Sequence, residues 1–484
     1  MYSLLQATLR KGKLMGKTLG KKNTTIVITE KTPLILLAGP MFLELFLNVM
    51  VNNVDTFMLS HYDEVAVGAV GNANRIMFMM NILFNVIATA TSVVVSQYLG
   101  AKRYDKMNMI YTLAVMVNFV FGVFLSGAFC AANPLIMDFL HISDNMRPHA
   151  MTYIYIVGGG GFILAVYNVM LQILRCNGFS MIGMWITLGI NFVNMFGNYL
   201  FLYGPLKHLN MGVAGVALST VASRIIAVVA IFIFFFAKRI GKIALRYLKP
   251  FPKKLLWKMI KIGLPTAGEN LTYNLYQTTL LSFINIMGED SANAKVYCDL
   301  LISFAMIFSN ACAMSTKIIT GHLVGAGKTE EAYKRVFKTL RTTLPITFGL
   351  AGINALLCRY TLHFFTSNPN IIALGQMIMI VDIFIEIGRC LNMTFVSSLK
   401  AAGAYIFPLI VGILCNWGLG LATGYAVGVL MGVGVAGIYA GTATDECIRG
   451  LIVMYYWYKK KWVGKSVVDK KRKDVLELEA KEAG

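Results

Sequence analysis

The chain has 484 residues, of which 57% are hydrophobic and only 14% are charged, and its formal net charge is +21. An ordinary soluble domain carries roughly a quarter charged residues, so this composition excludes one. Such a positive charge would suggest a nucleic-acid partner for a soluble chain. Here the basic residues lie between long apolar stretches, which indicates a protein of the lipid bilayer that binds no nucleic acid.

Apolar stretches long enough to cross a bilayer recur along the whole chain. Because about 20 apolar residues in a helix cover the hydrocarbon core, we predict an all-α membrane protein with twelve transmembrane helices. The predicted spans are residues 34–59, 76–99, 109–131, 151–174, 181–203, 211–237, 257–287, 296–323, 337–360, 371–399, 405–429 and 431–457.

The distribution of basic residues predicts the orientation of these helices. Lysine and arginine gather before residue 34 and directly after residue 237, whereas the opposite loops carry acids such as Asp63 and Glu289. The positive-inside rule then places both termini in the cytoplasm of a multi-pass protein of the cell membrane, which requires an even number of spans. No short apolar segment with a small-residue cleavage site follows the basic tail, so we predict no cleaved signal peptide.

The sequence also contains an internal repeat, in which the second half matches the first at one constant offset. Pro40 aligns with Pro265, Glu44 with Glu269, and Gly100 with Gly325, in one ungapped register over four predicted helices. Six spans in each half make both halves start from the same side, which predicts a parallel repeat with the transport path between the halves. The predicted regions are a basic tail (1–33), an N-terminal lobe (34–237), a basic linker (238–256), a C-terminal lobe (257–458) and a charged tail (459–484).

Two motifs resemble nucleotide-binding loops, and we reject both. The segment 322–329 begins with histidine where a phosphate-binding loop has glycine, and the glycine-rich segment 432–437 follows no strand. The eight cysteines form no metal-binding pattern and are interpreted as packing residues. We therefore predict no enzyme, no catalytic residue, no resident metal and no cofactor.

Four segments together resemble the multidrug and toxic compound extrusion (MATE) family. They are Ala38–Thr56, which contains the Pro-to-Val-Asp-Thr spacing, Val95–Arg103 (VSQYLGAKR), Ile262–Pro265 (IGLP) and Leu399–Gly403 (LKAAG). The resemblance covers residues 33–458. It implies two six-helix bundles that form a V-shaped cleft, and antiport in which H⁺ or Na⁺ enters while organic, often cationic, compounds leave.

The first predicted helix carries a polar stripe formed by Glu44, Asn48, Asn52 and Asp55. At about 100° per residue these four positions fall within roughly 80° of one another. Ionisable groups inside a span are costly and are functional candidates by default, although a structural seam of hydrogen bonds is the alternative interpretation. The resemblance assigns cation coupling to Asp55, which matches the family's aspartate in this helix.

The fifth predicted helix carries Asn194 and Asn198, where some family members have a cation site shared with the first helix. An asparagine can coordinate a cation but cannot titrate. The resemblance therefore makes Asp55 the only ionisable group of this predicted site.

The second half carries further candidates for substrate or ion binding. The seventh helix holds Glu269, Tyr273, Tyr276 and Gln277, but the family's glutamate position falls on Tyr273, so the match of Glu269 is inexact. The tenth helix holds Glu386 and Arg389, which are spaced so that they can pair. The family's sodium-site aspartate falls on Arg389, so this chain departs from the family's pattern at that site. Na⁺ at Asp55, or at Glu269 and Glu386, is an alternative to H⁺.

The leading hypothesis is a monomeric secondary antiporter for a small organic substrate. We expect cationic cargo because the intramembrane charges read as mostly acidic, with Arg389 as the main exception; Arg175 and Lys400 are interpreted as orientation anchors at span ends. The alternative is a lipid-linked saccharide or lipid flippase of the same superfamily, which tends to line its cleft with basic residues. A channel or a membrane enzyme is disfavoured by the repeat and by the lack of a catalytic cluster.

Overall fold

The computed structural model describes residues 28–60, 64–139 and 142–468; within these ranges the side chains of residues 51–57, 60, 64 and 139 are outside the description. The N-terminal group of helices comprises α2 (Leu34–Ser60), α3 (Glu64–Gly100), α4 (Met107–Phe139), α5 (Arg147–Tyr153), α6 (Gly161–Cys176), α7 (Ser180–Leu202) and α8 (Gly212–Ala237). The C-terminal group comprises α9 (Lys253–Ile286), α10 (Glu289–Gly325), α11 (Thr329–Leu362), α12 (Pro369–Ala401), α13 (Ile406–Ile413), α14 (Leu421–Tyr425) and α15 (Val435–Tyr458).

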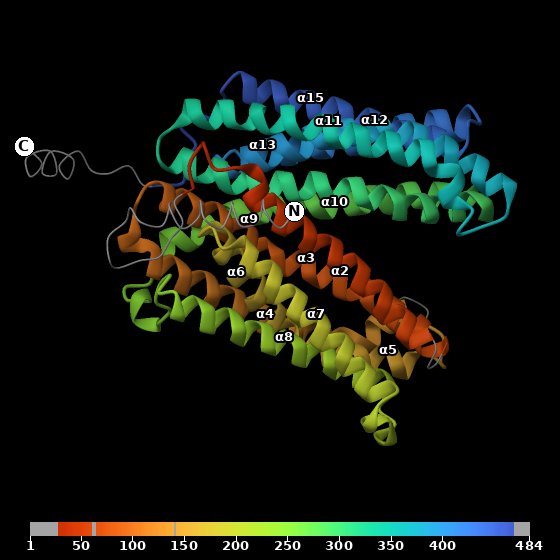
Figure 1. The fold of residues 1–484 in the computed structure, drawn as a ribbon, viewed down its shortest axis with the longest axis horizontal. Helices are drawn as coiled ribbons and strands as arrows, with labels where there is room; N and C mark the ends of the chain where they lie inside the picture. The colour runs from red at the N-terminus through yellow and green to blue at the C-terminus, as the bar shows by residue number, and fades with distance from the viewer. Residues whose placement is uncertain (1–27, 61–63, 140–141, 469–484) are drawn as a thin grey trace, which may run out of the picture.

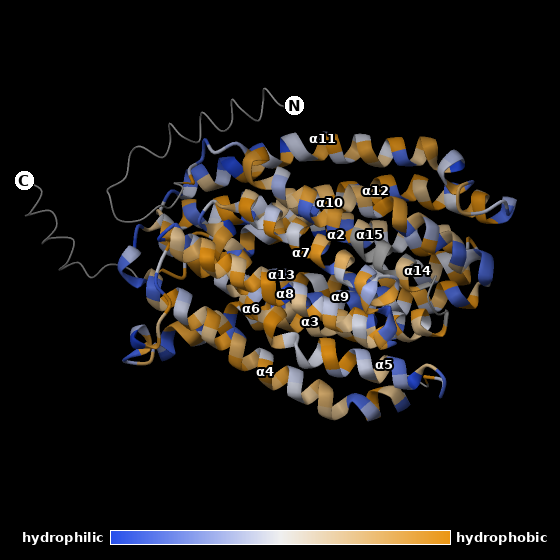
Figure 2. Ribbon diagram, turned by 60° about the horizontal axis from the view of Figure 1, so that its bottom comes forward, coloured by the Kyte–Doolittle hydropathy of each residue, from blue (hydrophilic) through white to orange (hydrophobic). Residues whose placement is uncertain are grey.

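The two groups lie side by side and meet mainly through α3, which packs against α9 and α10, and through α2, which packs against α10. In Figure 1 the groups lie close together at the left of the view, and their ribbons diverge toward the right. Figure 2 shows apolar residues along the lengths of the helices and hydrophilic residues gathered in the loops at both ends. A membrane protein is expected to show this distribution, because apolar side chains face the hydrocarbon core of the bilayer and polar side chains lie in the water on either side.

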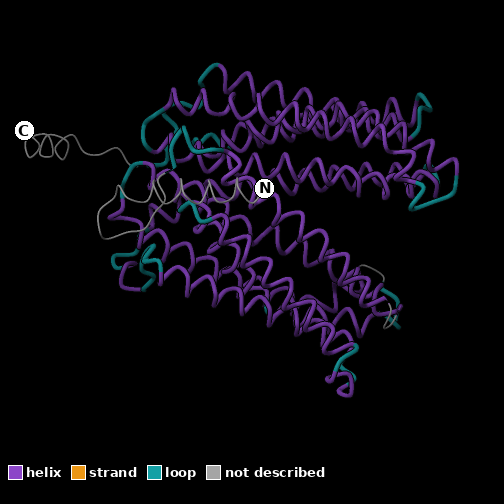
Figure 3. Tube along the Cα trace, in the orientation of Figure 1, coloured by secondary structure: helices purple, strands orange, loops and turns teal. Residues whose placement is uncertain are grey.

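Every regular element in the described ranges is a helix (Figure 3), which confirms the all-α prediction. Among the described residues, eight helices are long and apolar enough to cross a membrane, and nine if the bent pair Arg147–Gly158 and Gly161–Cys176 counts as one span. α9 and α15 fall outside this count because charged and amide residues interrupt their apolar sequence. The twelve-span count and the parallel layout of two lobes stay predictions.

The fourth predicted span, 151–174, is not one straight helix. The chain bends by 45° between Gly158 and Gly161, after a π-helical turn at Ile154–Gly158. Four successive glycines occupy residues 158–161. Glycine has a low helix propensity and π-bulges are common sites of kinks, so the local sequence explains a break that the apolar pattern did not predict.

The crossing of α3 and α10 brings two backbones into direct contact. A Cβ atom added at Gly100 would overlap the carbonyl oxygen of His322, and one added at Gly325 would overlap the carbonyl oxygen of Gln97. The repeat that aligns Gly100 with Gly325 also aligns Gln97 with His322. The two contacts of this crossing are therefore equivalent under the internal repeat. We call the end of the molecule where α3 and α10 cross the junction end.

Alanine at Gly100 is expected to destabilise the protein by about 1–3 kcal/mol, the usual cost of overpacking a close contact. The matched control is Gly71→Ala on the same helix, where an added Cβ meets nothing within 4 Å. That control should be neutral or stabilising, because alanine favours a helix. Thermal unfolding of the two purified variants measures the difference, and equal unfolding temperatures would contradict the close crossing.

Candidate functional site

The predicted site residue Glu44 on α2 forms a buried ion pair with Arg175 on α6. Nη2 of Arg175 lies 2.6 Å from Oε1 of Glu44, and the two side chains are only 5% and 4% exposed. The hydroxyl of Thr187 on α7 donates a second hydrogen bond to the same oxygen, over 3.2 Å. A buried charge is tolerated when it is paired and hydrogen-bonded, so Glu44 fastens α2 to α6 and α7.

Glu269 on α9 forms the corresponding pair with Lys400 on α12. Nζ of Lys400 lies 2.8 Å from Oε2 of Glu269. The repeat offset aligns Glu269 with Glu44 and Lys400 with Arg175. Arg175 and Lys400, which were interpreted as orientation anchors, are therefore each bonded to a carboxylate inside their own group of helices, a role that the sequence analysis did not predict.

α2 and α7 run in parallel, in one register. The amide of Asn191 donates to Oδ1 of Asn48 over 3.0 Å, and Thr187 donates to Glu44. Both contacts join residues that are 143 positions apart. The side chains of Asn52 and Asp55, farther along α2, lie outside the described residues.

The two predicted asparagines of α7 are both buried. Asn194 donates through Nδ2 to the hydroxyl of Thr220 on α8, over 3.2 Å, and its carbonyl oxygen accepts from Ser219. Asn198 lies one turn farther along the same helix. These contacts fix α7 against α8 and leave both amides inside the N-terminal group.

A cavity of about 520 Å³ lies between α3, α6, α7 and α8. Its polar lining comprises Asn74, Asn81, Tyr153, Asn191, Asn194, Thr220, Ser223 and Arg224. Its apolar lining includes Met77, Phe78, Met80 and Phe84. None of the described residues that line the cavity is acidic, and the sequence analysis missed Arg224 even though it is an ionisable residue inside a predicted span.

The three other candidates of α9 lie against the C-terminal helices. The side-chain amide of Gln277 donates to the hydroxyl of Tyr273 over 3.0 Å, and the ring of Tyr273 lies 5.6 Å from the guanidinium carbon of Arg449 on α15. Tyr276 is fully buried, with its ring centroid 6.3 Å from that of Tyr273. These aromatic side chains therefore line a charged region formed with α12 and α15.

Glu386 and Arg389 on α12 are bonded to each other, as their spacing allowed. Sequence analysis missed four charged residues close by. Arg449 bonds both Asp445 and Glu446 on α15, over 3.0 Å and 2.9 Å. The sequence could have revealed these three residues, because each is an ionisable residue inside the last predicted span, 431–457.

The fourth residue that was missed is Asp382 on α12. It is 1% exposed, and neither of its carboxylate oxygens accepts a hydrogen bond from any described residue. It lines a cavity of about 50 Å³ together with Gln277, Asp299, Arg389 and Tyr439. The C-terminal group therefore contains a dense network of buried charges, whereas the N-terminal cavity carries mainly amides.

Two hydrogen bonds join the helix groups at the junction end. The amide of Gln97 donates to the carbonyl oxygen of Ala401 over 2.5 Å, and Nε2 of His322 lies 2.9 Å from the carbonyl oxygen of Cys176. The repeat offset relates the two bonds with the lobes exchanged, because Gln97 aligns with His322 and Cys176 with Ala401. The C-terminal segment adds a further contact, because the backbone N–H of Val467 donates to Oε1 of Gln97 over 2.8 Å.

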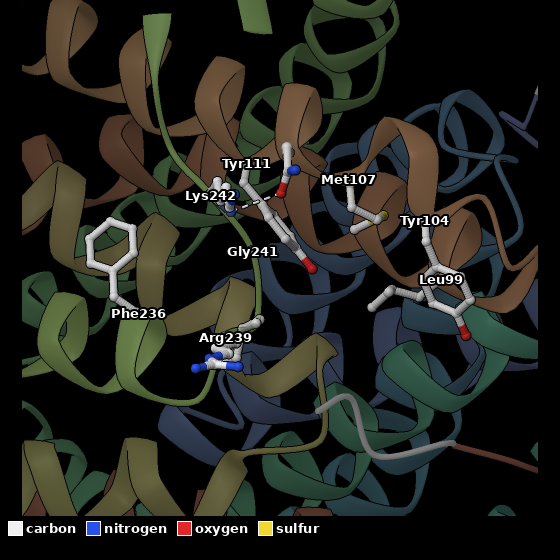
Figure 4. Close-up of a pocket in the computed structure, with 10 residues that line it drawn as sticks. Leu99, Tyr104, Met107, Tyr111, Phe236, Arg239, Gly241 and Lys242 are labelled. Atoms are coloured by element: carbon white, nitrogen blue, oxygen red, sulfur yellow. Dashed lines mark hydrogen bonds between the residues drawn. The ribbon is translucent and has the colours of Figure 1, made fainter. Parts of the chain in front are cut away.

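A second cavity of about 420 Å³ lies in the N-terminal group of helices, between α3, α4 and the segment that follows α8 (Figure 4). It is lined by Leu99 of α3, Tyr104, Tyr111 of α4, and the segment after α8 that contains Arg239 and Lys242. The dashed line in Figure 4 is the bond from the backbone N–H of Lys242 to Oδ1 of Asn108, over 2.8 Å. None of the predicted site residues is among the described residues that line this cavity.

Comparison with known proteins decides the family. The family model described as MatE matches the chain twice, over residues 40–200 and 265–426. The chain belongs to the MATE family. The two matches begin at Pro40 and Pro265, the positions that align in the internal repeat. Members of this family are transporters and not enzymes. The predicted family and the prediction that the chain is no enzyme are therefore both confirmed.

Relatives of this MATE transporter match it over nearly their whole lengths. "Uncharacterized transporter YisQ" of Bacillus subtilis is 33% identical over 432 residues, which cover 89% of this chain and 95% of the relative. "Probable multidrug resistance protein NorM" of Thermotoga maritima is 24% identical over 447 residues, which cover 91% and 94% of the two chains. The chain is therefore a multi-pass membrane transporter related to multidrug efflux proteins.

Solved MATE structures share the fold of this chain. A structure of a multidrug resistance MATE family transporter in the outward-facing conformation superposes with a TM-score of 0.84 at 18% identity, over 91% of this chain and 98% of that one. A structure of a transporter from Pyrococcus furiosus, which is described as having a binding pocket of reverse polarity, superposes with a TM-score of 0.82 at 18% identity, over 89% of this chain and 96% of that one. At this level of identity the likeness concerns the fold alone.

Proposed function

We propose that this MATE transporter is a secondary active antiporter that exports organic compounds across the cell membrane in exchange for H⁺ or Na⁺. In this proposal it works as a monomer with both termini in the cytoplasm. Two parallel six-helix lobes, residues 34–237 and 257–458, form a V-shaped cleft and are joined by the linker 238–256. The coupling cation binds at Asp55, Asn194 and Asn198.

The shared register of α2 and α7 carries this proposal. Glu44 and Asn48 contact residues of α7 that lie 143 positions later in the chain. Both helices continue without a break, to Ser60 and Leu202. The same separation brings position 55 level with Asn198, so the register supports one site formed by a titratable residue and neighbouring amides.

The second half of the proposed cycle uses the C-terminal charges. Glu269, Glu386 and Arg389, with Tyr273, Tyr276 and Gln277, form the proposed site for cargo or for a second ion. All three charged residues are already engaged in ion pairs. A cargo molecule or ion that binds there would have to replace one partner of an ion pair. The inward- and outward-facing conformations could then bind that ligand with different affinities, as coupling requires.

The contacts at the junction end support alternating access. Gln97 and His322 bond the opposite group of helices at that end, whereas the N-terminal cavity lies toward the diverging end. In the proposed orientation the junction end is cytoplasmic, because the basic segment after α8 lies there, so this conformation faces outward. Return to the inward-facing state would break both reciprocal bonds and separate α3 from α10.

Proteoliposomes test the proposal. Purified protein is reconstituted with an entrapped fluorescent organic dye, and an inward gradient of H⁺ or of Na⁺ is then imposed. We expect one gradient to accelerate dye release and an ionophore that collapses it to remove the acceleration. Release that ignores both gradients would refute antiport.

The structure removes the main argument for restricting the cargo to cations. The carboxylates of Glu44, Glu269 and Glu386 each bond a basic side chain, and the N-terminal cavity contains Arg224. A basic residue in the transport cavity also favours the second candidate function, a lipid-linked saccharide or lipid flippase. Translocation of a labelled lipid without an ion gradient would identify that alternative.

A further inference from the structure

Arg224 occupies the middle of α8, between Gly212 and Ala237. A charge at this depth of a membrane helix is costly, and arginines there face a protein interior or a water-filled cavity. Arg224 is half-buried and lines the N-terminal cavity of about 520 Å³. Its position near the helix centre separates it from the basic residues at helix ends, which orient a membrane protein.

The guanidinium of Arg224 has no carboxylate partner in the described part of the chain. By contrast, Arg175, Arg389, Arg449 and Lys400 are each bonded to at least one carboxylate there. The charge of each of those four residues is therefore already paired within its own group of helices. The five N–H donors of Arg224 remain available to a molecule that enters the cavity.

Two amides of the cavity lining, Asn74 and Asn81, have their side-chain oxygens occupied by other residues of the protein. Oδ1 of Asn81 accepts from both Asn85 and Asn168, each over 2.9 Å. Oδ1 of Asn74 accepts from the hydroxyl of Tyr153 over 3.1 Å. Because the protein occupies these oxygens, the side-chain NH₂ groups of Asn74 and Asn81 are left to bond a ligand, and both residues line the same cavity as Arg224.

The rest of the lining is suited to an apolar body. Met77, Phe78, Met80 and Phe84 line the cavity, and thioether and aromatic side chains adapt to ligands of varied shape. The cavity volume also falls within the range of about 300–1,000 Å³ that is usual for small-molecule sites. A donor-rich polar side and an apolar side together match an amphiphile whose polar group accepts hydrogen bonds.

We propose that the N-terminal cavity binds the oxyanion of an amphiphilic cargo, a carboxylate, sulfonate or phosphate, through Arg224 with the amides of Asn74 and Asn81. This inference rests on the proposed export function and names its substrate class. A planar guanidinium bonds two oxygens of an oxyanion at once. The oxyanion can belong to a soluble amphiphile or to a lipid-linked phosphate.

Equilibrium binding without any ion gradient tests this inference. The probes are a fluorescent aryl carboxylate and its methyl ester, which differ in charge and hardly in shape, titrated against the purified full-length protein. We expect the wild-type protein to bind the carboxylate at least about tenfold more tightly than the ester, as charge-assisted bonds imply. Equal affinities would overturn the proposal without any mutation.

Variants locate the effect at Arg224. Arg224→Gln should raise the Kd for the carboxylate by about ten- to a hundredfold and leave the Kd for the ester within about threefold, while Arg224→Lys should recover part of the loss. The matched control is Arg75→Gln, an exposed arginine of α3 that does not line the cavity. An equal effect of Arg224→Gln on both probes, or a similar effect of Arg75→Gln, would overturn the assignment.

Competition distinguishes the two sources of the oxyanion. Displacement of the bound carboxylate by a polyprenyl diphosphate, lost in Arg224→Gln, would identify a lipid-linked cargo; resistance to it would identify a soluble one. Arg224-dependent binding without gradient-driven release would refute antiport and keep this inference. Gradient-driven release together with binding that ignores Arg224 would do the reverse.

Discussion

Replacing Asp55 by asparagine is expected to abolish gradient-driven efflux and to leave the protein folded. The register of α2 against α7 brings position 55 level with Asn198, and among the residues of the proposed site only Asp55 can lose and gain a proton. Asparagine keeps the size of the side chain and one oxygen that can coordinate a cation, but it carries no negative charge and cannot take up or release a proton. Initial rates of dye release from proteoliposomes under an imposed ΔpH or ΔpNa measure the effect.

The control for this experiment is Asp144→Asn, which removes an exposed acid in the loop before α5. That variant should release dye at the wild-type rate. Substrate binding by the folded Asp55→Asn protein should persist, because the substitution removes coupling and not the cavity. A well-folded Asp55→Asn protein that exports at the wild-type rate would remove Asp55 from the mechanism.

Glu44→Gln is expected to destabilise the protein by about 3–5 kcal/mol, the usual result of removing one partner of a buried ion pair. The substitution leaves the guanidinium of Arg175 buried without its carboxylate, in a side chain that is 5% exposed. Titration with a denaturing detergent, followed by circular dichroism, measures the loss. The double variant Glu44→Gln with Arg175→Met should lose less than the sum of the two single losses, because neither charge then remains unpaired.

The pair formed by Glu330 and Lys460 provides the matched control for that measurement. These residues lie 2.6 Å apart but remain about half exposed, so water already solvates both charges. Lys460→Met should leave the unfolding midpoint close to that of the wild type. Equal losses from the two pairs would mean that the burial of Glu44 and Arg175 does not determine their contribution.

The sequence predicted contacts well where the partners lie on one helix. Glu386 and Arg389 are three residues apart, so helical geometry alone placed them together. Glu44 and Arg175 are 131 residues apart, and no local rule joins them. The internal repeat contained a hint of this pair, because an acid and a base recur in both halves at the same offset. A repeat shows only which positions are equivalent, however, and not which side chains are close together.

Apolar patterns also predicted the positions of helices better than their lengths and shapes. The span predicted at 76–99 covers only the C-terminal part of α3, which begins at Glu64. A hydropathy pattern detects the part of a helix that lies in the hydrocarbon core, so the predicted span ends where polar residues begin even if the helix continues. The same emphasis on apolar runs drew attention away from Arg224, Asp382 and Glu446, charged residues whose partners or cavity only the fold reveals.

Cargo-driven movement of the coupling ion tests the central claim most directly. Sealed proteoliposomes are loaded with cargo and placed in cargo-free buffer at equal internal and external pH and Na⁺, with a pH- or Na⁺-sensitive dye inside. Antiport predicts that cargo leaving down its gradient draws H⁺ or Na⁺ inward against a developing gradient, and that Asp55→Asn prevents this uptake. Cargo efflux with no ion movement, or with ions leaving alongside the cargo, would contradict the account.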